Sequence, residues 1–243
     1  MEWEDDAFVL SARPYGESGA IVELLTEQHG RFAAHIAGGA SRKHRATLQP
    51  GSRVIAQYRA RTSDQLGSAV LEPVGEGPSS LLDDPLALAG LASAASVAVG
   101  ALPEREPHPG VFGGFGALVQ AFALTDLWPA VYIRFEAGLL DELGFGFDLS
   151  RCGATGVTDD LIYFSPRTGR AVSRAAGEPY KDRLLRLPPF MLGAQAGLGT
   201  GDVDDGLKLT GAFLERWVFD PLNKPLPPAR VWLIDKLRDA DRL

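Results

Sequence analysis

Short apolar runs separated by turn residues fill the first 75 residues of the chain. Val, Ile, Leu, Phe and Tyr are concentrated in five runs, at residues 7–13, 20–26, 31–37, 53–61 and 68–72. The residues between the runs are rich in Gly and Pro, which indicate turns. Runs of this length and composition predict β-strands. Five short strands, with one long loop at residues 38–52 behind Gly38-Gly39, predict a small Greek-key barrel of the OB type.

The fourth run alternates between two faces. One face carries Arg53, Ile55, Gln57, Arg59 and Arg61, and the other carries Val54, Ala56, Tyr58 and Ala60. Successive side chains of a strand point to opposite faces of the sheet. The parity therefore favours a place in the core for Tyr58, opposite the arginines. If Phe32 and Tyr58 were exposed instead, they could stack nucleic-acid bases.

Beyond a Gly/Pro/Ser-rich stretch at residues 72–80, the apolar spacing becomes helical. The sequence Asp83-Asp84-Pro85 is typical of a helix start, with acidic caps followed by Pro in the first turn. Helices are predicted at 85–101, 111–127, 128–143, 204–219 and 228–241. The chain is thus predicted to be an α+β protein, with a barrel domain at residues 1–79 and a mostly helical domain at residues 80–243.

One segment, at residues 149–187, interrupts the helical pattern. Leu161–Phe164 and Ala171–Ser173 have the composition of strands, and they flank a turn at Ser165–Arg170. This pattern predicts a β-hairpin inserted between helices.

Composition places the chain among ordinary globular proteins. Of its 243 residues, 45% are hydrophobic and 23% are charged, and the formal net charge is −7. The single cysteine fits a reducing compartment, and the acidic start MEWEDDAF lacks the positive charge of an export signal. The Ala/Leu-rich segment 85–103 has the small residues of a packed helix rather than those of a membrane span. We therefore expect a cytoplasmic protein that makes no membrane contact.

The charge is distributed unevenly. Residues 1–27 hold seven acids against one arginine, whereas residues 28–63 hold seven basic residues and no acid, a local excess of +7. Charges farther than ~8–10 Å are screened at physiological salt, so a partner responds to the nearest surface. The excess predicts a phosphate-binding surface made of Arg31, Arg42, Lys43, Arg45, Arg53, Arg59 and Arg61. The alternative is a solvated barrel surface whose basic residues merely balance the acidic start.

A second, weaker basic group lies in the hairpin segment. It consists of Arg167, Arg170, Arg174, Lys181, Arg183 and Arg186. Glu178 and Asp182 are the acids interspersed among these residues, so the local excess is smaller than in the barrel.

No pattern in the sequence indicates catalysis. A phosphate loop, a dinucleotide fingerprint, an esterase elbow and a metal-binding histidine pair are all absent from it. Cys152 has no histidine near it in sequence to act as a base, and it lacks the three partners that a structural zinc ion needs. We expect neither an enzyme nor a cofactor.

Several short motifs occur in an order that is specific as a set. Those in the first part of the chain are Ala7–Leu10, Arg13–Ser18, Leu25–Arg31, Gly38–Arg42 and Leu48–Pro50. Those in the second part are Arg134–Glu136, Leu139-Leu140, Leu143–Gly146, Leu149–Cys152, Phe164–Pro166 with Gly169, and Pro225-Leu226. Over essentially the whole chain, this order resembles the RecO family of bacterial recombination mediators and DNA-annealing proteins.

The resemblance implies an N-terminal OB-fold, a helical C-terminal domain and, in many members, a small zinc-binding insert with four cysteines in two pairs. Laid on this chain, the four ligand positions are Cys152, Thr155, Ser173 and Ala176. Three of the four ligands are therefore missing. We predict a degenerate zinc-ribbon-like hairpin that holds no metal.

The resemblance also implies a function in recombinational DNA repair by the RecF pathway, in the cytoplasm at the nucleoid. RecO-like proteins bind single- and double-stranded DNA, anneal complementary strands, and act with RecR and RecF to load RecA onto single strands coated by SSB. They recognise the acidic, hydrophobic C-terminal tail of SSB through the helical domain. The motif Arg-Phe-Glu makes Arg134 the candidate cation for this tail, and an ion pair within the helical domain is its equal alternative.

Two other classes of function stay open from the residues alone. One is a protein-interaction adaptor that binds RecR and SSB without significant DNA affinity of its own. The other is a hydrolase that uses an unrecognised pocket.

Overall fold

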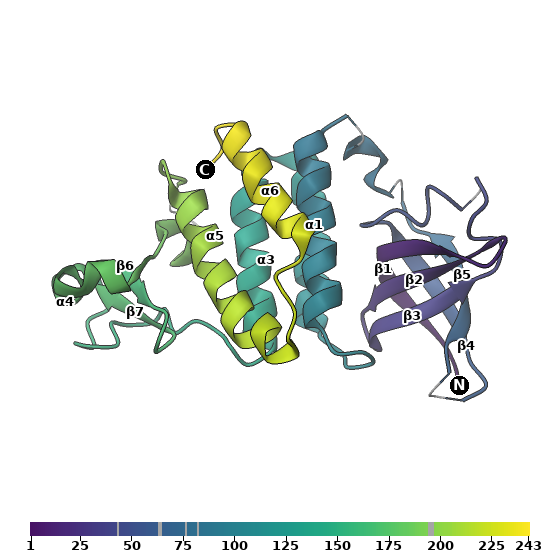
Figure 1. The fold of residues 1–243 in the computed structure, drawn as a ribbon, viewed down its shortest axis with the longest axis horizontal. Coiled ribbons are helices and arrows are strands. Elements are labelled where there is room, and N and C mark those ends of the chain that lie inside the picture. The colour runs from purple at the N-terminus through teal and green to yellow at the C-terminus, as the bar shows by residue number, and fades with distance from the viewer. Residues whose placement is uncertain (43, 63–64, 76, 82, 194–196) are drawn as a thin grey trace. The chain divides into compact units, whose positions relative to one another are not determined.

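The computed structural model describes residues 1–243 with the exception of residues 43, 63–64, 76, 82 and 194–196 (Figure 1). The chain divides into two compact units. The first comprises Met1–Leu124 with Pro227–Arg230, and the second comprises Thr125–Leu226 with Val231–Leu243. The domain boundary expected after residue 79 stays a prediction.

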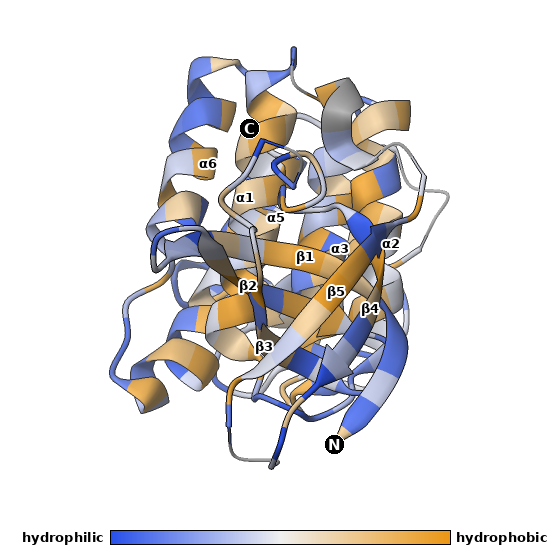
Figure 2. Ribbon diagram, turned by 90° about the vertical axis from the view of Figure 1, so that its right-hand side faces the viewer, coloured by the Kyte–Doolittle hydropathy of each residue, from blue (hydrophilic) through white to orange (hydrophobic). Residues whose placement is uncertain are grey.

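Five strands of the first unit close into a barrel, as the sequence predicted (Figure 2). They are β1 (Glu2–Tyr15), β2 (Gly19–Thr26), β3 (Gly30–Ile36), β4 (Arg53–Arg59) and β5 (Gly67–Pro73). Their order around the barrel is β1-β2-β3-β5-β4, and β4 closes it by pairing with β1. The pair β3 and β5 is parallel, and the other four pairs are antiparallel.

β1 is longer than the run expected at residues 7–13. Its first part pairs with β4, starting with Glu2 opposite Arg59. Acidic side chains alternate here with Trp3, which packs against the barrel core, and with the buried Asp5. The polar composition of residues 2–6 concealed this alternation in the sequence.

The parity expected for the fourth run is confirmed. Val54, Ala56 and Tyr58 are buried, and Tyr58 accepts a hydrogen bond of 3.0 Å on its hydroxyl from the backbone amide of Gly67. A Cβ at Gly67 would lie 2.3 Å from Cζ of Tyr58. Glycine at this position therefore lets β5 pass close to the ring.

Two helices belong to the first unit, α1 (Pro85–Ala101) and α2 (Pro109–Leu124), together with a 3-10 segment at Gly77–Leu81. The Asp84 carboxylate caps α1 by accepting hydrogen bonds of 3.0 Å from the amides of the second and third helical residues. Phe112 of α2 packs on Phe8 of β1, with ring centroids 5.1 Å apart. The second helix, expected at residues 111–127, begins two residues earlier and ends three residues earlier.

The second unit combines helices with a small sheet. Its helices are α3 (Trp128–Glu142), α4 (Arg174–Gly177), α5 (Asp202–Phe213), a π-helical segment (Leu214–Phe219) and most of α6 (Pro228–Asp239), with 3-10 turns at Glu178–Arg183, Pro189–Met191 and Asp220–Leu222. Its sheet has the order β7-β6-β8 and consists of β6 (Leu161–Ser165), β7 (Arg170–Ser173) and β8 (Leu185–Arg186). The expected hairpin is confirmed, whereas the third strand and the π-helical segment were not predicted.

Aromatic rings join this sheet to α5. Phe164 of β6 and Phe213 of α5 are buried, with ring centroids 5.4 Å apart, and Phe147 lies 5.0 Å from each of them. A Cβ at Gly206 of α5 would lie 2.8 Å from Cδ1 of Ile133, so glycine there permits close packing of α5 on α3. No helix in the parts of the chain that the structure describes is long and apolar enough to cross a membrane.

Candidate nucleic-acid interface

The outer face of β4 carries two of the predicted phosphate-binding arginines, and both lie beside acids of β1. The guanidinium of Arg53 pairs with Asp6 at 2.5 Å between Nη2 and Oδ2, and Nε of Arg59 lies 2.8 Å from Oε1 of Glu2. Between these two pairs, the side-chain amide of Gln57 donates a hydrogen bond of 3.0 Å to Glu4. The antiparallel register thus aligns the acid-rich start of the chain with a strand from the acid-free stretch.

These ion pairs change the field that a polyanion would meet. A hydrogen bond with the Asp6 side chain raises the pKa of Arg53, which shows how closely the carboxylate holds this guanidinium. A phosphate must compete with Asp6 for Arg53 and with Glu2 for Arg59. Exposed ion pairs contribute only about 0–1 kcal/mol, so the competition is modest, but it lowers the charge that these arginines present.

Arg31 of β3 is the least accessible of the predicted set. Its side chain is 13% exposed, with Nη1 2.6 Å from Glu23 of β2 and Nη2 3.4 Å from Glu104. Its Nε donates a 3.0 Å hydrogen bond to the carbonyl of Leu102. Arg31 therefore links the barrel to the segment between α1 and α2, and its contact with DNA stays a prediction.

Three predicted arginines, Arg42, Arg45 and Arg61, are exposed. None of the three forms an ion pair with any acid in the described parts of the chain. Lys43, the neighbour that the sequence placed in the same set, lies outside the described residues. Among the described members of the predicted set, these three arginines are the side chains with the least competition for a phosphate.

The segment that carries Arg42 and Arg45 is held by turns. The amide of Ala40 donates a 2.9 Å hydrogen bond to the carbonyl of Ser18, and the amide of Leu48 donates one of 2.9 Å to the carbonyl of His44. The side chain of Leu48 is buried in the barrel core. These contacts hold the chain on either side of Arg42 and Arg45, at Ala40 and at Leu48.

The barrel aromatics are packed into the core or against one another. Phe32 and Tyr58 are each 2% exposed. The indole of Trp3 is stacked between His29, at a centroid distance of 4.3 Å, and Tyr58, at 4.7 Å. Both faces of Trp3 are therefore covered. Of the two alternatives for Phe32 and Tyr58, the structure supports the core, and base stacking on these rings is excluded in this conformation.

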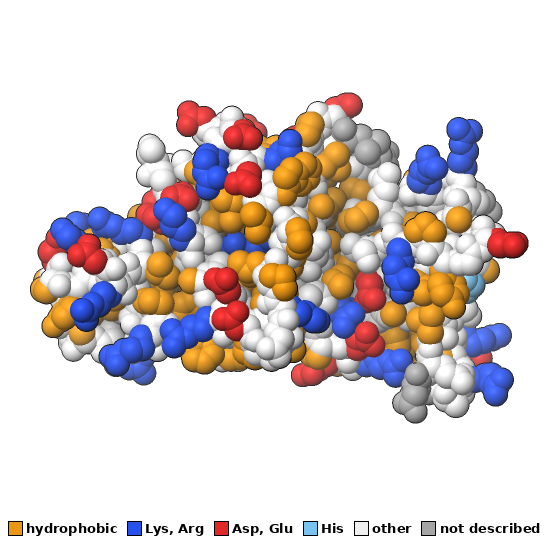
Figure 3. All heavy atoms as spheres, viewed as in Figure 1, with side chains coloured by type: hydrophobic (Ala, Val, Ile, Leu, Met, Phe, Trp, Pro, Cys, Tyr) orange, Lys and Arg blue, Asp and Glu red, His pale blue; other side chains and the backbone are white. Residues whose placement is uncertain are grey.

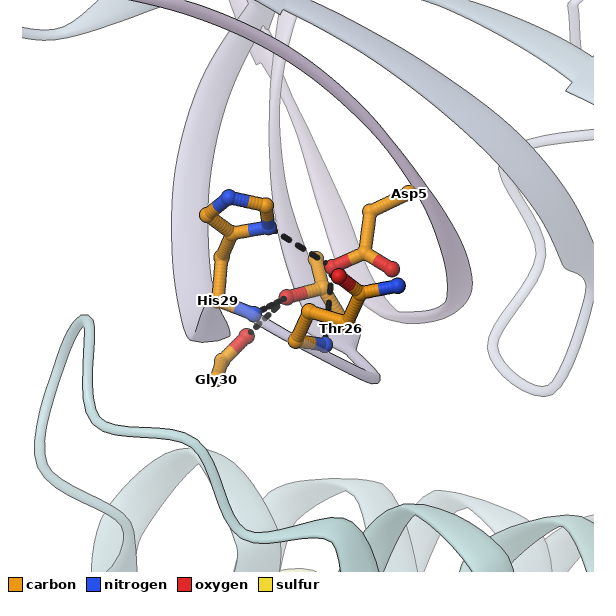
Figure 4. A network of polar contacts seen from close by, with 5 residues as sticks. Asp5, Thr26, His29 and Gly30 are labelled. Atoms are coloured by element: carbon orange, nitrogen blue, oxygen red, sulfur yellow. Dashed lines mark hydrogen bonds and ion pairs between the residues drawn. The ribbon is translucent and has the colours of Figure 1, made fainter.

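A polar network fixes the β2–β3 turn beside this stack (Figure 4). The buried carboxylate of Asp5 accepts a 2.9 Å hydrogen bond from the amide of Gln28 and lies 2.8 Å from Nδ1 of His29. The hydroxyl of Thr26 donates to the carbonyl of Gly30 at 2.9 Å and accepts from the amide of His29 at 3.1 Å. The network orients the imidazole against Trp3, and only the turn itself could be predicted from the sequence.

A hollow of about 610 Å³ opens next to the β1–β4 ion pairs. Its lining residues are Glu2, Trp3, Ala37, Gln57, Tyr58, Arg59, Ser68, Ala69 and Val70. Arg59 and Glu2 form an ion pair here, and Val70 is 61% exposed. Since the ring faces of Trp3 are covered, this hollow offers an apolar wall and one arginine rather than a stacking platform.

In the second unit, Arg134 of α3 bonds to backbone carbonyls rather than to an acid. Its Nη2 donates to the carbonyl of Phe190 at 2.5 Å and to that of Gly193 at 3.2 Å. The motif residue Glu136 is buried and accepts hydrogen bonds from Tyr132 at 2.8 Å and from Thr210 at 2.5 Å. Arg134 is exposed, so its role at a partner's carboxylates stays a prediction.

The degenerate zinc positions lie around Cys152, which is buried. The Sγ atom accepts a hydrogen bond of 3.3 Å from the amide of Ser173 and one of 3.5 Å from its hydroxyl. Burial raises the pKa of the Cys152 thiol, but hydrogen bonds from Ser173, Thr155 and Ala154 outweigh it and lower the pKa to about 6. Among the described residues, no group of three His, Cys, Asp or Glu side chains is arranged to hold a metal ion. The absence of zinc stays a prediction.

A closed five-stranded barrel, a helical region and a three-stranded insert define an OB-barrel protein with a helical C-terminal part. The family model described as "Recombination protein O N terminal" matches residues 1–72, and "Recombination protein O C terminal" matches residues 82–225. The chain is 72% identical over 243 residues to the "DNA repair protein RecO" of Phenylobacterium zucineum (strain HLK1), with 100% of both chains covered.

Other relatives bear the same name. The protein of Caulobacter sp. (strain K31) is 68% identical over 243 residues, and 100% of both chains is covered. That of Rhodospirillum centenum is 52% identical over 242 residues, which cover 99% of this chain and 96% of the relative. The chain therefore belongs to the RecO family of DNA repair proteins.

Proposed function

We propose that this protein is a non-enzymatic recombination mediator that binds single- and double-stranded DNA and anneals complementary strands. In this role it assists the loading of RecA onto single strands coated by SSB. The observation that carries the DNA contact is the exposed set Arg42, Arg45 and Arg61, which has no ion-pair partner in the described parts of a RecO-family chain.

Arg42, Arg45 and Arg61 supply the main phosphate contacts, with Lys43 beside them in sequence. Arg53 and Arg59 add contacts when a phosphate displaces Asp6 and Glu2. Contacts of this kind release condensed counterions, so affinity falls as salt rises, by about 0.7 log units per log unit of salt for each contact to a single strand. Binding is sequence-tolerant, since phosphates carry no base identity.

Phosphate contact without base stacking on the barrel suits strand annealing. Phe32 and Tyr58 are buried, and both faces of Trp3 are covered. A strand held at the arginines through its backbone keeps its base edges available for a complementary strand. Stacking of each base on an aromatic ring would instead have to be broken before pairing, at a cost of about 1–3 kcal/mol per base.

The partners that we propose are RecR, the C-terminal tail of SSB, RecF and RecA. For the tail, Arg134 is the candidate cation. The two backbone carbonyls at Phe190 and Gly193 engage one nitrogen of its guanidinium, which has five N–H donors in all. The remaining donors suit a carboxylate.

One observation favours the adaptor as the second candidate function. The pairing of Arg53 with Asp6 and of Arg59 with Glu2 reduces the positive charge of the β4 face below that expected from the sequence. An adaptor would bind RecR or an SSB-tail peptide normally while showing no DNA affinity of its own.

The test is a salt series of single-strand binding with the triple variant Arg42→Ala, Arg45→Ala and Arg61→Ala. We expect its affinity to fall at least tenfold and its salt slope to decrease by about 2, since three phosphate contacts are lost. The matched control removes three exposed cations of the second unit that are paired with acids, by Arg174→Ala, Lys208→Ala and Arg238→Ala. Equal affinities and slopes in the two triple variants would refute the DNA contact at these arginines.

A further inference from the structure

A hollow of about 280 Å³ lies in the second unit, between the β6–β7 turn and the π-helical segment. Its lining residues are Phe145, Gly146, Pro166, Arg167, Thr168, Gly169, Phe213 and Trp217. The first two follow α3, the next four form the turn, and the last two come from the end of α5 and from the π-helical segment. Three separate stretches of the chain thus converge on it.

Aromatic rings from the end of α5 and from the π-helical segment face this hollow. Phe213 is buried and packs on Phe164 of β6, which anchors the floor to the sheet. Trp217 is 38% exposed, and its ring plane lies within 19° of that of Phe145, with centroids 6.0 Å apart. π-helical turns occur disproportionately at functional sites. Here the segment sets a large aromatic side chain at the surface, where burial does not account for it.

Two arginines lie beside the rings. Cζ of Arg216 is 5.0 Å from the centroid of Trp217, and Arg167 is an exposed residue of the turn. Neither forms an ion pair with an acid among the residues that the structure describes. Figure 3 shows several Lys and Arg side chains over the part of the second unit that carries β6, β7 and α4.

Some of the acidic side chains near the hollow make contacts with other residues. The carboxylate of Asp148 accepts hydrogen bonds from Ser150 and lies 3.5 Å from Arg170. The carboxylate of Asp141 lies against Gly146, where a Cβ would be 2.0 Å from Oδ1. Arg167 and Arg216, which have no ion-pair partner among the described residues, suit the rim to an anion.

We propose that this hollow binds one nucleotide of single-stranded DNA. The base packs on the exposed part of the Trp217 and Phe145 rings, and the phosphate lies at Arg167 and Arg216. The inference rests on the proposed DNA-binding function and adds a contact outside the barrel. Aromatic rings beside a basic groove are the means by which proteins bind single strands without sequence preference. The volume is below the ~300–1,000 Å³ typical of sites for larger ligands, so it suits one base rather than a folded segment.

An acidic peptide is the other class of ligand with this charge. Such a peptide needs a cation for each of several carboxylates and an enclosed site for its apolar side chain. The hollow instead presents nearly parallel ring planes, partly open to solvent, with only Arg167 and Arg216 beside it. These features favour a planar base with one phosphate.

Tryptophan fluorescence of the full chain reports on this site. The chain has four tryptophans, of which Trp217, at 38% exposure, and Trp232, at 52%, are the two exposed ones. A short oligothymidylate is expected to quench the wild type and Trp232→Phe alike, and to lose that quenching in Trp217→Phe. In the background of Arg42→Ala, Arg45→Ala and Arg61→Ala, Trp217→Ala and Arg167→Ala should each weaken binding of the oligonucleotide roughly tenfold, whereas the control Arg174→Ala should not. Circular dichroism identifies any variant that fails to fold.

The outcomes separate this inference from the proposed function. In a background of Arg42→Ala, Arg45→Ala and Arg61→Ala, quenching of Trp217 by the oligonucleotide should persist. If the wild type binds DNA through the barrel arginines and Trp217→Phe leaves the quenching unchanged, the nucleotide site is refuted and the proposed function stands. If no DNA binds the wild type, the proposed function itself fails. Quenching of Trp217 by an acidic peptide with a terminal aromatic residue, but not by the oligonucleotide, would overturn the nucleotide site in favour of a peptide site.

Discussion

At the scale of single residues, the arginines of the barrel differ in what lies beside each guanidinium. Arg31 is held by Glu23 and Glu104, and Arg53 and Arg59 are paired with Asp6 and Glu2. Sequence proximity did not reveal these partners, because Asp6 lies 47 residues before Arg53 and Glu2 lies 57 before Arg59.

The release of a paired arginine gives a first prediction. Asp6→Asn removes the partner of Arg53, so we expect tighter single-strand binding and a salt slope steeper by about 0.7, the share of one phosphate contact. The matched control is Glu4→Gln on the same strand, which removes one acid but faces Gln57 rather than an arginine. Fluorescence anisotropy across a salt series measures both variants. If both variants gain the same affinity and show the same salt slope, the gain comes from the general loss of negative charge and not from the release of Arg53.

The Cys152 thiol gives a second prediction at this scale. Its pKa is about 6 in the folded protein, below the value of about 8.5 for a free thiol. A lowered folded-state pKa stabilises the protein above the unfolded-state pKa, and the gain is lost as the pH falls to the folded-state value. The stability advantage of the wild type over Cys152→Ala should therefore grow from about pH 6 to about pH 8.5.

Urea unfolding at several pH values measures this difference, and the ultraviolet absorbance of the thiolate measures the pKa directly. Ser173→Ala removes one of the hydroxyl donors to Sγ and should raise the pKa. A stability difference that does not vary with pH would show that Cys152 is a neutral thiol in the folded protein.

At the scale of elements, the turns of the barrel depend on glycine to different degrees. Gly30 has a φ of +73°, and a Cβ there would lie 1.9 Å from the carbonyl oxygen of Glu106. Gly16 has a φ of +64°, but a Cβ there would meet nothing within 4 Å. Gly16→Ala should cost about 1–2 kcal/mol for the left-handed backbone alone. Gly30→Ala should cost about 3 kcal/mol or more, because the backbone of the segment between α1 and α2 must also move.

Thermal and urea unfolding of the two glycine variants compares the costs directly. The pair is matched, since both positions are turn glycines of the barrel with similar φ. Equal losses of stability would mean that the segment carrying Glu106 moves freely away from β3 and does not brace it.

Strands and helices could be predicted from the sequence wherever one face of the element is apolar. The parity of β4 and the hairpin at β6 and β7 were predicted because their apolar positions alternate or cluster beside clear turns. The first part of β1 was missed because its outer positions are acids and Asp5 is buried. β8 was missed because it has only two residues. The apolar stripe of residues 204–219 continues through the change from α5 to the π-helical segment, so the spacing gave no sign of that change.

For the candidate site, the sequence identified which side chains are basic but not which of them are engaged. The acid-free stretch 28–63 has a local excess of +7, yet its strand β4 lies beside the acidic start of β1 in the barrel. Trp3 and Trp217 were not singled out, because a lone aromatic residue looks the same in sequence whether its ring is stacked, buried or exposed. Only the packing distinguishes Trp3, whose ring is stacked between His29 and Tyr58, from Trp217, whose side chain is 38% exposed beside Phe145 and Arg216.

At the scale of the whole molecule, a net charge of −7 means that the DNA contact that we propose depends on a few cations that escape ion pairing. Arg42, Arg45 and Arg61 do so in the first unit, and Arg167 and Arg216 do so in the second. A protein that holds one strand at each unit brings two strands to the same chain. Annealing would then require both sites, whereas the binding of one strand requires either.

This arrangement gives a last prediction. The barrel variant Arg42→Ala, Arg45→Ala and Arg61→Ala, and separately Trp217→Ala, should each slow annealing of complementary oligonucleotides by a larger factor than they weaken binding of one strand. The reason is that annealing depends on the product of the two occupancies, while the remaining site still binds one strand. Fluorescence energy transfer between labelled strands measures the annealing rate, and Trp232→Ala, on the exposed part of α6, is the control. If annealing in both variants falls only in proportion to the binding of one strand, then one strand contacts both units. The arrangement with a separate strand at each unit would then be wrong.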